Sequence, residues 1–192
     1  MTWRKVVVAS VVAVCGTIGL LYWFLNRPVP IVPPTAALYD GRYETGGYYQ
    51  VTRFNDDGRH RIVVNLGSAV GEGKPGVYPI KLSYMNVLTS QYDTPLQRMG
   101  PSRGPIDSLE RLLRRFQSRN KVAQWISESG EANVTVHSPP GANGRYSISV
   151  ELKDVVLRKE GSKKPPTPDP ARVDPDLCKI DSLLLGPVEF GK

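Results

Sequence analysis

The chain is poor in the residues that carry most metal and nucleophilic chemistry. It has two cysteines and two histidines among 192 residues. Cys15 lies in an apolar stretch and Cys178 lies near the C-terminus, so no disulfide framework is expected. Neither His60 nor His137 stands at a metal-ligand spacing, and both cysteines are distant in sequence. We therefore expect neither a metal nor a cofactor.

Motifs that would indicate catalysis are scarce as well. The stretch GSAVGEGKP resembles a phosphate-binding loop, but the spacing from Gly67 to Gly73 is one residue too long. Pro75 stands where a serine or threonine would bind magnesium. No C-x-x-C pair occurs. These absences favour a non-catalytic protein.

Charge is missing from one long stretch near the N-terminus, Val6–Leu25. The stretch exceeds the apolar region of a cleavable signal, about 7 to 15 residues, and no A-x-A pattern follows it. About 20 helical residues match a hydrocarbon core of roughly 30 Å. Trp3 and the pair Tyr22–Trp23 lie at its two ends, where aromatic rings favour lipid headgroups. The pattern predicts a retained transmembrane helix over residues 6–25.

The flanking charges predict an orientation. Arg4 and Lys5 precede the apolar stretch, and Arg27 alone follows it closely. The positive-inside rule then places residues 1–5 in the cytoplasm and the C-terminal domain on the periplasmic or exterior side of the inner (plasma) membrane. Because the margin is one or two charges, a cytoplasmic C-terminal domain stays an alternative.

Small residues recur along one side of this predicted helix. Ala9, Ala13 and Gly16 fall at helical spacing. Such a stripe lets a second transmembrane helix approach closely, although small residues also occur where a helix faces lipid. We keep both alternatives and take the stripe as a candidate contact with an integral membrane partner.

Prolines divide the remainder of the chain. The chain has 17 prolines, and they are dense in residues 26–39 and 161–176. Proline lacks a backbone N–H, so these segments predict a stiff polyproline stalk and a linker rather than helix or sheet. The segmentation is therefore a stalk over 26–39, an extrinsic domain over 40–160, a linker over 161–176 and an apolar arm over 177–192.

The extrinsic domain has the alternation of β-strands. Residues 48–66 predict a hairpin with Gly58 in its turn, and residues 132–152 predict a second hairpin. Pro79 makes residues 77–87 an edge strand, and Asp154 breaks the alternation at a bulge or corner. The expected fold is mainly antiparallel β, a sandwich or partly open barrel, with one packed amphipathic helix.

That helix is predicted over residues 106–121. Its apolar side chains, at i, i+3, i+4 and i+7, are Leu109, Leu112, Leu113 and Phe116. Arg111, Arg114 and Arg115 point to the opposite side. This basic face predicts a solvated surface, an acidic protein partner or anionic lipid headgroups. Interleaved aromatics and a recognition motif are lacking, so no nucleic acid is expected.

The C-terminal arm is too apolar to be a solvated tail without contacts. Its candidate docking residues are Leu177, Ile180, Leu183, Leu184, Leu185 and Phe190. The arm docks either on its own domain, as an added edge strand, or on a partner protein.

Three features therefore predict contact with a partner: the helix with its small-residue stripe, the basic face and the arm. They predict a non-catalytic, single-pass membrane protein that serves as an accessory or scaffolding subunit of a larger complex of respiratory, photosynthetic or secretion type. The alternative is a membrane-anchored binding module for a lipid or other apolar ligand. Such a module would hold its ligand in a cavity lined by Tyr78, Ile80, Tyr146 and Ile148.

Overall fold

The chain is organised as two compact units, which are described separately. A computed structural model describes residues 3–26, 28–44, 50–66, 74–84, 86–93, 95, 121–137, 146–163 and 174–190. The first unit, Met1–Pro30, is called the helical unit, and the second, Ile31–Lys192, is called the β unit. The basic face predicted over residues 106–121 lies outside the described residues, except for Lys121.

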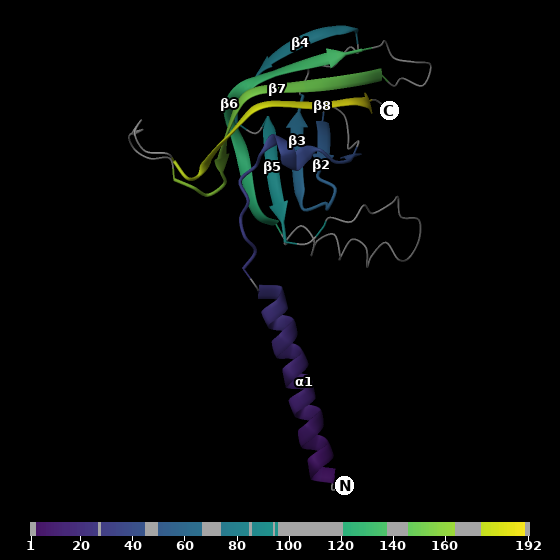
Figure 1. Ribbon diagram of the computed structural model, residues 1–192, viewed down its shortest axis with the longest axis vertical. Helices are drawn as coiled ribbons and strands as arrows, with labels where there is room; N and C mark the ends of the chain where they lie inside the picture. Colours follow the sequence, from purple (N-terminus) through teal and green to yellow (C-terminus); the bar gives the residue numbers. More distant parts are fainter. Residues whose placement is uncertain are drawn as a thin grey trace. The chain divides into compact units, whose positions relative to one another are not determined.

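The helical unit contains one α-helix, α1, from Trp3 to Asn26 (Figure 1). Two hydroxyls bond to carbonyls four residues earlier: Ser10 Oγ donates to Val6 O and Thr17 Oγ1 donates to Ala13 O. The predicted helix over residues 6–25 therefore forms. The prediction that it crosses a membrane is not supported, because the part of the chain that the structure describes contains no helix both long and apolar enough for a crossing.

The β unit begins with a short 3-10 helix, η1, Ala36–Tyr39, and continues as one eight-stranded antiparallel sheet. Its strands are β1 Tyr43–Glu44, β2 Gln50–Phe54, β3 His60–Asn65, β4 Gly76–Lys81, β5 Val87–Tyr92, β6 Lys121–Val136, β7 Tyr146–Lys159 and β8 Leu177–Phe190. The strand order is β1-β2-β3-β5-β6-β7-β8, and β4 pairs with β6 beside this path. The sheet curls into a half-barrel, which confirms the predicted mainly antiparallel β fold (Figure 1).

The curl arises in the long strand β6. Its first half pairs with β5, and its second half pairs with β4. Between the halves the register with β7 shifts around Ser129. Gly130 has φ +135°, and a Cβ there would lie 2.8 Å from Val155 Cα, so only glycine fits this close approach of two backbones. Asp154, with φ +49°, lies on the facing strand and is the predicted break in alternation.

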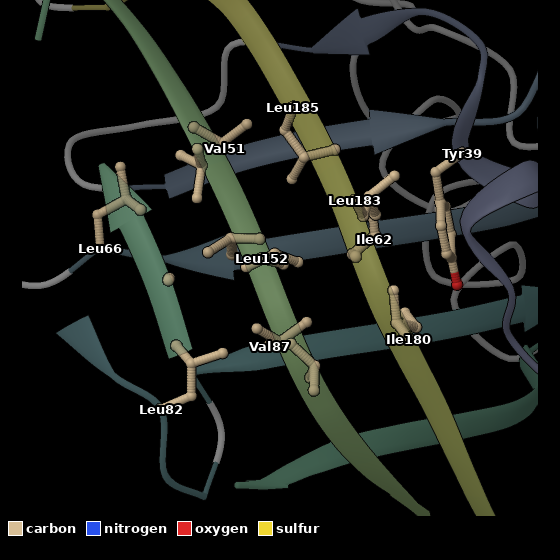
Figure 2. Packing of buried hydrophobic residues seen from close by; sticks show 14 of the residues in the cluster. Tyr39, Val51, Ile62, Leu66, Leu82, Val87, Leu152, Ile180, Leu183 and Leu185 are labelled. Atoms are coloured by element: carbon tan, nitrogen blue, oxygen red, sulfur yellow. The ribbon is translucent and has the colours of Figure 1, made fainter. Parts of the chain in front are cut away.

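The bend brings two parts of the sheet face to face. In Figure 2, strands β7 and β8 cross over β2, β3 and β5, with apolar side chains between them. Ile62, Val87, Leu152, Leu157 and Leu185 are fully buried there. The core therefore fills the inside of the half-barrel.

The local hairpins agree with the sequence. Residues 50–65 form β2 and β3, and the Gly58 N–H donates to Asn55 O across the turn, at 3.0 Å, with φ +71°. The predicted edge strand is shorter than expected, because it ends at Lys81 and the chain turns before β5 begins at Val87. Lys121, assigned to the end of the predicted helix, instead opens strand β6.

Neighbouring leucines in β8 provide a stability test. Leu185 is fully buried, whereas Leu184 is 59% exposed. Leu185→Ala should lower the free energy of unfolding by about 2 to 5 kcal/mol, through lost burial and a cavity. Leu184→Ala should change it by less than about 0.5 kcal/mol. Urea unfolding of the two variants checks this, and equal losses would contradict the placement of β8.

Candidate interaction surfaces

Helix α1 carries most of the exposed apolar side chains of the described residues. Eleven large apolar side chains on α1 are exposed, among them Val8, Val12 and Ile18 at 61 to 65%. Trp3, Tyr22 and Trp23, near its two ends, are 66 to 81% exposed. Because Ser10 and Thr17 bond to the backbone of the helix itself, their hydroxyls need no external partner. The helix thus offers an apolar surface.

The predicted small-residue stripe lies on this surface. Ala9 and Ala13 form the floor of a shallow apolar groove, and Lys5, Val8 and Val12 complete its lining. Gly16 has open space around it, because an added Cβ would meet no atom within 4 Å. Contact between the stripe and a partner helix stays a prediction.

The C-terminal arm forms strand β8 on its own domain, which was one of the two alternatives. It pairs with β7 from Leu177 to Phe190. Of the candidate docking residues, Ile180, Leu183 and Leu185 are buried in the core, and Leu177 is half-buried. Leu184 is exposed, and the side chain of Phe190 lies outside what the structure describes, so contact of the arm with a partner remains a prediction for these two side chains.

Side chains of β1 and β2 join strand β8 to the other end of the sheet. Arg53 Nη1 donates to Leu184 O at 3.2 Å, and its Nε donates to Gly41 O at 3.0 Å. The Gly186 N–H donates to the Tyr43 hydroxyl, and the Arg53 guanidinium lies 4.8 Å from the Tyr43 ring centre. Helix η1 also contacts β2, β3 and β8. We call these contacts the seam.

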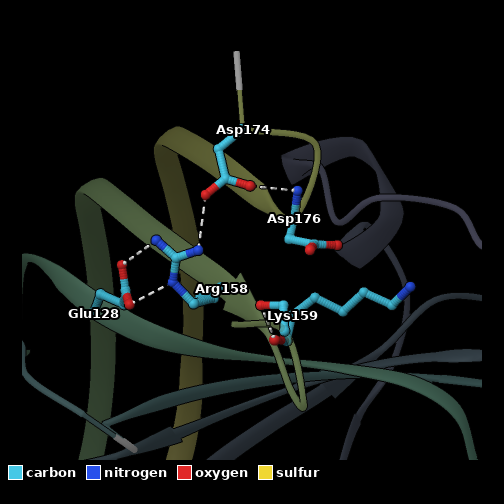
Figure 3. A network of polar contacts seen from close by, with 6 residues as sticks. Glu128, Arg158, Lys159, Asp174 and Asp176 are labelled. Carbon is cyan, nitrogen blue, oxygen red and sulfur yellow. Dashed lines mark hydrogen bonds and ion pairs between the residues drawn. The ribbon is translucent and has the colours of Figure 1, made fainter. Parts of the chain in front are cut away.

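A second set of contacts holds the entry to β8, and we call it the clamp. The Arg158 guanidinium binds both carboxylate oxygens of Glu128, at 2.6 and 3.3 Å, and Asp174 at 2.8 Å (Figure 3). Asp174 also accepts the Asp176 N–H at 3.0 Å. These hydrogen bonds, that from Arg158 above all, lower the pKa of Asp174. The clamp links β6, β7 and β8, so its chemistry is structural.

The other titratable groups that the structure describes do not converge on a reactive centre. Burial raises the pKa of the Tyr39 phenol and of the Cys178 thiol, which makes neither a nucleophile at neutral pH. Hydrogen bonds to Asp154 and Asp181 raise the pKa of Lys179. Within the described ranges, no group of three or more His, Cys, Asp or Glu side chains could hold a metal ion.

Three of the four predicted cavity residues lie in or against the packed core, and the side chain of the fourth, Tyr146, lies outside what the structure describes. Ile148 is fully buried in the apolar cluster. Tyr78 and Ile80, on β4, pack against that cluster and are partly buried. Position 146 begins β7 opposite Phe190. The packing of these residues gives no support to the ligand-binding alternative.

The chain contains one pattern with the spacing of a catalytic serine motif. Residues 100–104 read GPSRG, which has the G-x-S-x-G spacing of a nucleophile elbow around Ser102. That motif acts at a sharp turn directly between a strand and a helix. Strand β5 ends at Tyr92, eight residues before Gly100, and the pattern itself lies outside the described residues. The spacing alone therefore assigns no activity.

His60 makes the β unit sensitive to acid. Asn55 Nδ2 lies 3.2 Å from His60 Nδ1 and donates to it, and no described group bonds to the buried Nε2. Burial above all lowers the pKa of His60 from 6.5; nearby Asp57 opposes the shift and Arg59 adds to it. The neutral ring thus stabilises the fold above pH 6.5, and this contribution is lost as pH falls from 6.5 through the lowered pKa.

The wild type should therefore lose free energy of unfolding between pH 7.5 and 5, in part through His60. His60→Gln should flatten this slope. Urea unfolding at each pH measures the slopes. Identical slopes for wild type and His60→Gln would refute the assignment.

Comparison with protein-family models, with curated proteins and with solved structures finds no match to this chain. Its function is accordingly argued from its own residues. The surfaces that enter this argument are the apolar side of α1 and the outside of the β unit.

Proposed function

We propose that this protein is a non-catalytic accessory or scaffolding subunit of a larger membrane protein complex. Helix α1 is the part that meets the apolar phase of the membrane or of the complex. The β unit is a folded module that α1 holds beside the other subunits. The chemistry of the complex resides in those partners.

The observation that carries this proposal is the contrast between the two units. The β unit encloses its own core, in which large side chains such as Tyr39, Ile62 and Leu185 have less than 2% exposure. Helix α1 has eleven exposed large apolar side chains instead, and none of its residues is buried where burial is described. A continuous apolar surface of this kind marks an interaction with a protein or a membrane. Scattered surface leucines or valines would need no such explanation.

The proposal does not depend on a crossing, since no described helix meets the requirement for one. A single crossing with the β unit on the periplasmic or exterior side stays a prediction. A reporter fused after Lys192 tests it, because activity restricted to the cytoplasm would place the β unit on the other side.

Fractionation of cells that make the full chain tests the proposal itself. The chain should sediment with membranes after an alkaline wash, and it should leave a mild detergent extract as part of an assembly larger than itself. Native gel electrophoresis and mass spectrometry of the co-eluting proteins measure the second property. A chain that stays in the soluble fraction, or that elutes from detergent alone, would refute the proposal.

The small-residue stripe supplies a matched pair of variants. Gly16→Leu adds a side chain where the chain itself leaves open space, so it should preserve α1 and even raise its helix propensity. It should nevertheless lower the fraction of the chain in the assembly, because a partner helix could no longer approach closely. Val11→Leu enlarges an exposed side chain on the opposite side and should leave that fraction unchanged. Equal effects of the two substitutions would exclude the stripe as the contact.

A further inference from the structure

Several hydrogen bonds connect residues at the two ends of the turn between β4 and β5. Asn86 Oδ1 accepts the Ser83 N–H at 2.7 Å and the Ser83 hydroxyl at 2.9 Å. The Asn86 N–H donates back to Ser83 O at 3.2 Å. The Leu82 N–H donates to Gly130 O at 2.8 Å, which ties the turn to the bend of the half-barrel. Ser83 and Asn86 are therefore fixed relative to each other, and Leu82 is fixed to β6.

A buried serine forms hydrogen bonds to the same turn from the core. Ser127, on β6, is fully buried. Its hydroxyl donates to Ser83 O at 2.7 Å and accepts the Val87 N–H at 3.0 Å, so it bonds both sides of the turn. A buried hydroxyl is costly unless it is hydrogen-bonded, and this one is satisfied entirely by the turn. The buried Ser127 hydroxyl therefore depends on Ser83 and Val87 for its hydrogen bonds.

This fixed turn presents an aromatic side chain to the outside. Tyr84 follows Ser83 and is 68% exposed. Ser83 before it and Asn86 after it bond to each other, so a contact through Tyr84 would need little further ordering of these two residues. Tyrosine also loses little entropy on binding, having two side-chain torsions, and it is enriched among the residues that dominate interface energies.

We propose that Tyr84 is the anchor through which the β unit binds a folded protein, namely another subunit of the assembly described above. The proposal rests on the proposed function, and it adds the position and the kind of partner. The partner presents an apolar recess that takes the ring, with a polar group at its end for the phenol hydroxyl. Tyr84 enters the recess as a preformed projection.

The charges near the turn favour a protein over a lipid surface. Lys81, at the end of β4, pairs in register with Glu131, which in turn pairs with Lys153 on β7. All three are exposed, and Lys153 forms an ion pair with Glu151 at 3.1 Å. Anionic lipid is recognised by clusters of basic residues, whereas a rim of mixed charge around an aromatic anchor is typical of protein interfaces.

A titration tests the anchor. Tagged full chain is added to detergent-solubilised membranes from source cells that lack it, and the concentration for half-maximal incorporation into the assembly is measured. Tyr84→Ser should raise this concentration about thirtyfold, the effect expected of an interface anchor. Val77→Ser removes another exposed apolar side chain, 61% exposed on β4, and should leave the value unchanged.

A second variant tests the fixed turn while keeping the aromatic ring. Asn86→Ala removes the acceptor of both Ser83 donors and should raise the half-maximal concentration by a smaller factor, about threefold to tenfold. Its thermal unfolding is measured alongside, so that a loss of the fold is recognised. A benzophenone side chain introduced at position 84 should cross-link to a subunit that co-elutes with the wild type, and one at position 77 should not.

The outcomes separate this inference from the proposed function. If the wild-type chain forms no assembly, both are overturned. If the wild type assembles and Tyr84→Ser assembles at the same concentration, the anchor alone is overturned and α1 carries the contact. A weakening by Tyr84→Ser equal to that by Val77→Ser would also overturn it, since loss of any exposed apolar group would then suffice.

Discussion

The close approach of two backbones at Gly130 is the constraint on which the rest of the β unit depends. With no side chain there, β6 can bend against β7, where a Cβ would come within 2.8 Å of Val155 Cα. Because β6 bends, its two halves can pair with different strands, β5 and β4, along one edge. The same bend turns the inner face of β7 and β8 toward β2, β3 and β5. One continuous sheet can therefore enclose a core that would otherwise require two separate sheets. The turn that carries Tyr84 is tied to this point through Gly130 O.

A curled sheet that does not close leaves its end strands, β1 and β8, each unpaired on one side, and this protein joins these two strands with side chains. Backbone pairing ends at β1 on one edge and at β8 on the other. Arg53 and Tyr43 then bond backbone groups of Leu184 and Gly186, which would otherwise be open to pairing with another chain. The Arg53 side chain is only 13% exposed, and its contacts with Gly41 O and the Tyr43 ring offset the loss of its hydration. At the other end of β8 the clamp at Arg158 uses a bidentate ion pair for the same purpose, since one planar guanidinium can hold two strands in a defined geometry.

Sequence reasoning succeeded where the determining interactions are local. The hairpin over residues 50–65 follows from alternation and a turn glycine, and the break at Asp154 follows from a single interruption of the pattern. Strand β5 was missed because Val87, Thr89, Ser90, Gln91 and Tyr92 are all buried, which removes the alternation that identifies a strand. The arm was left between two alternatives because three successive leucines do not reveal a period; in the structure Leu183 and Leu185 are buried and Leu184 is not. The seam and the fixed turn had no sequence signal at all, since Arg53 and Leu184 are 131 positions apart and Ser83 and Ser127 are 44 apart.

The enclosed β unit restricts how this protein can act on a partner. Its core is filled, its end strands β1 and β8 are joined at the seam, and its outer face over β6 and β7 carries charged and polar residues such as Glu131, Asn133 and Glu151. A surface of that composition stays hydrated and gives little affinity by itself. Contacts strong enough to hold a subunit in place must then come from the few apolar groups left outside, which are concentrated on α1 and represented on the β unit by single side chains such as Tyr84. In the proposed subunit two weak contacts on one chain would reinforce each other, because binding of α1 would raise the effective concentration of the β unit at its own site. A scaffold needs this arrangement, since neither contact has to be tight for the assembly to persist.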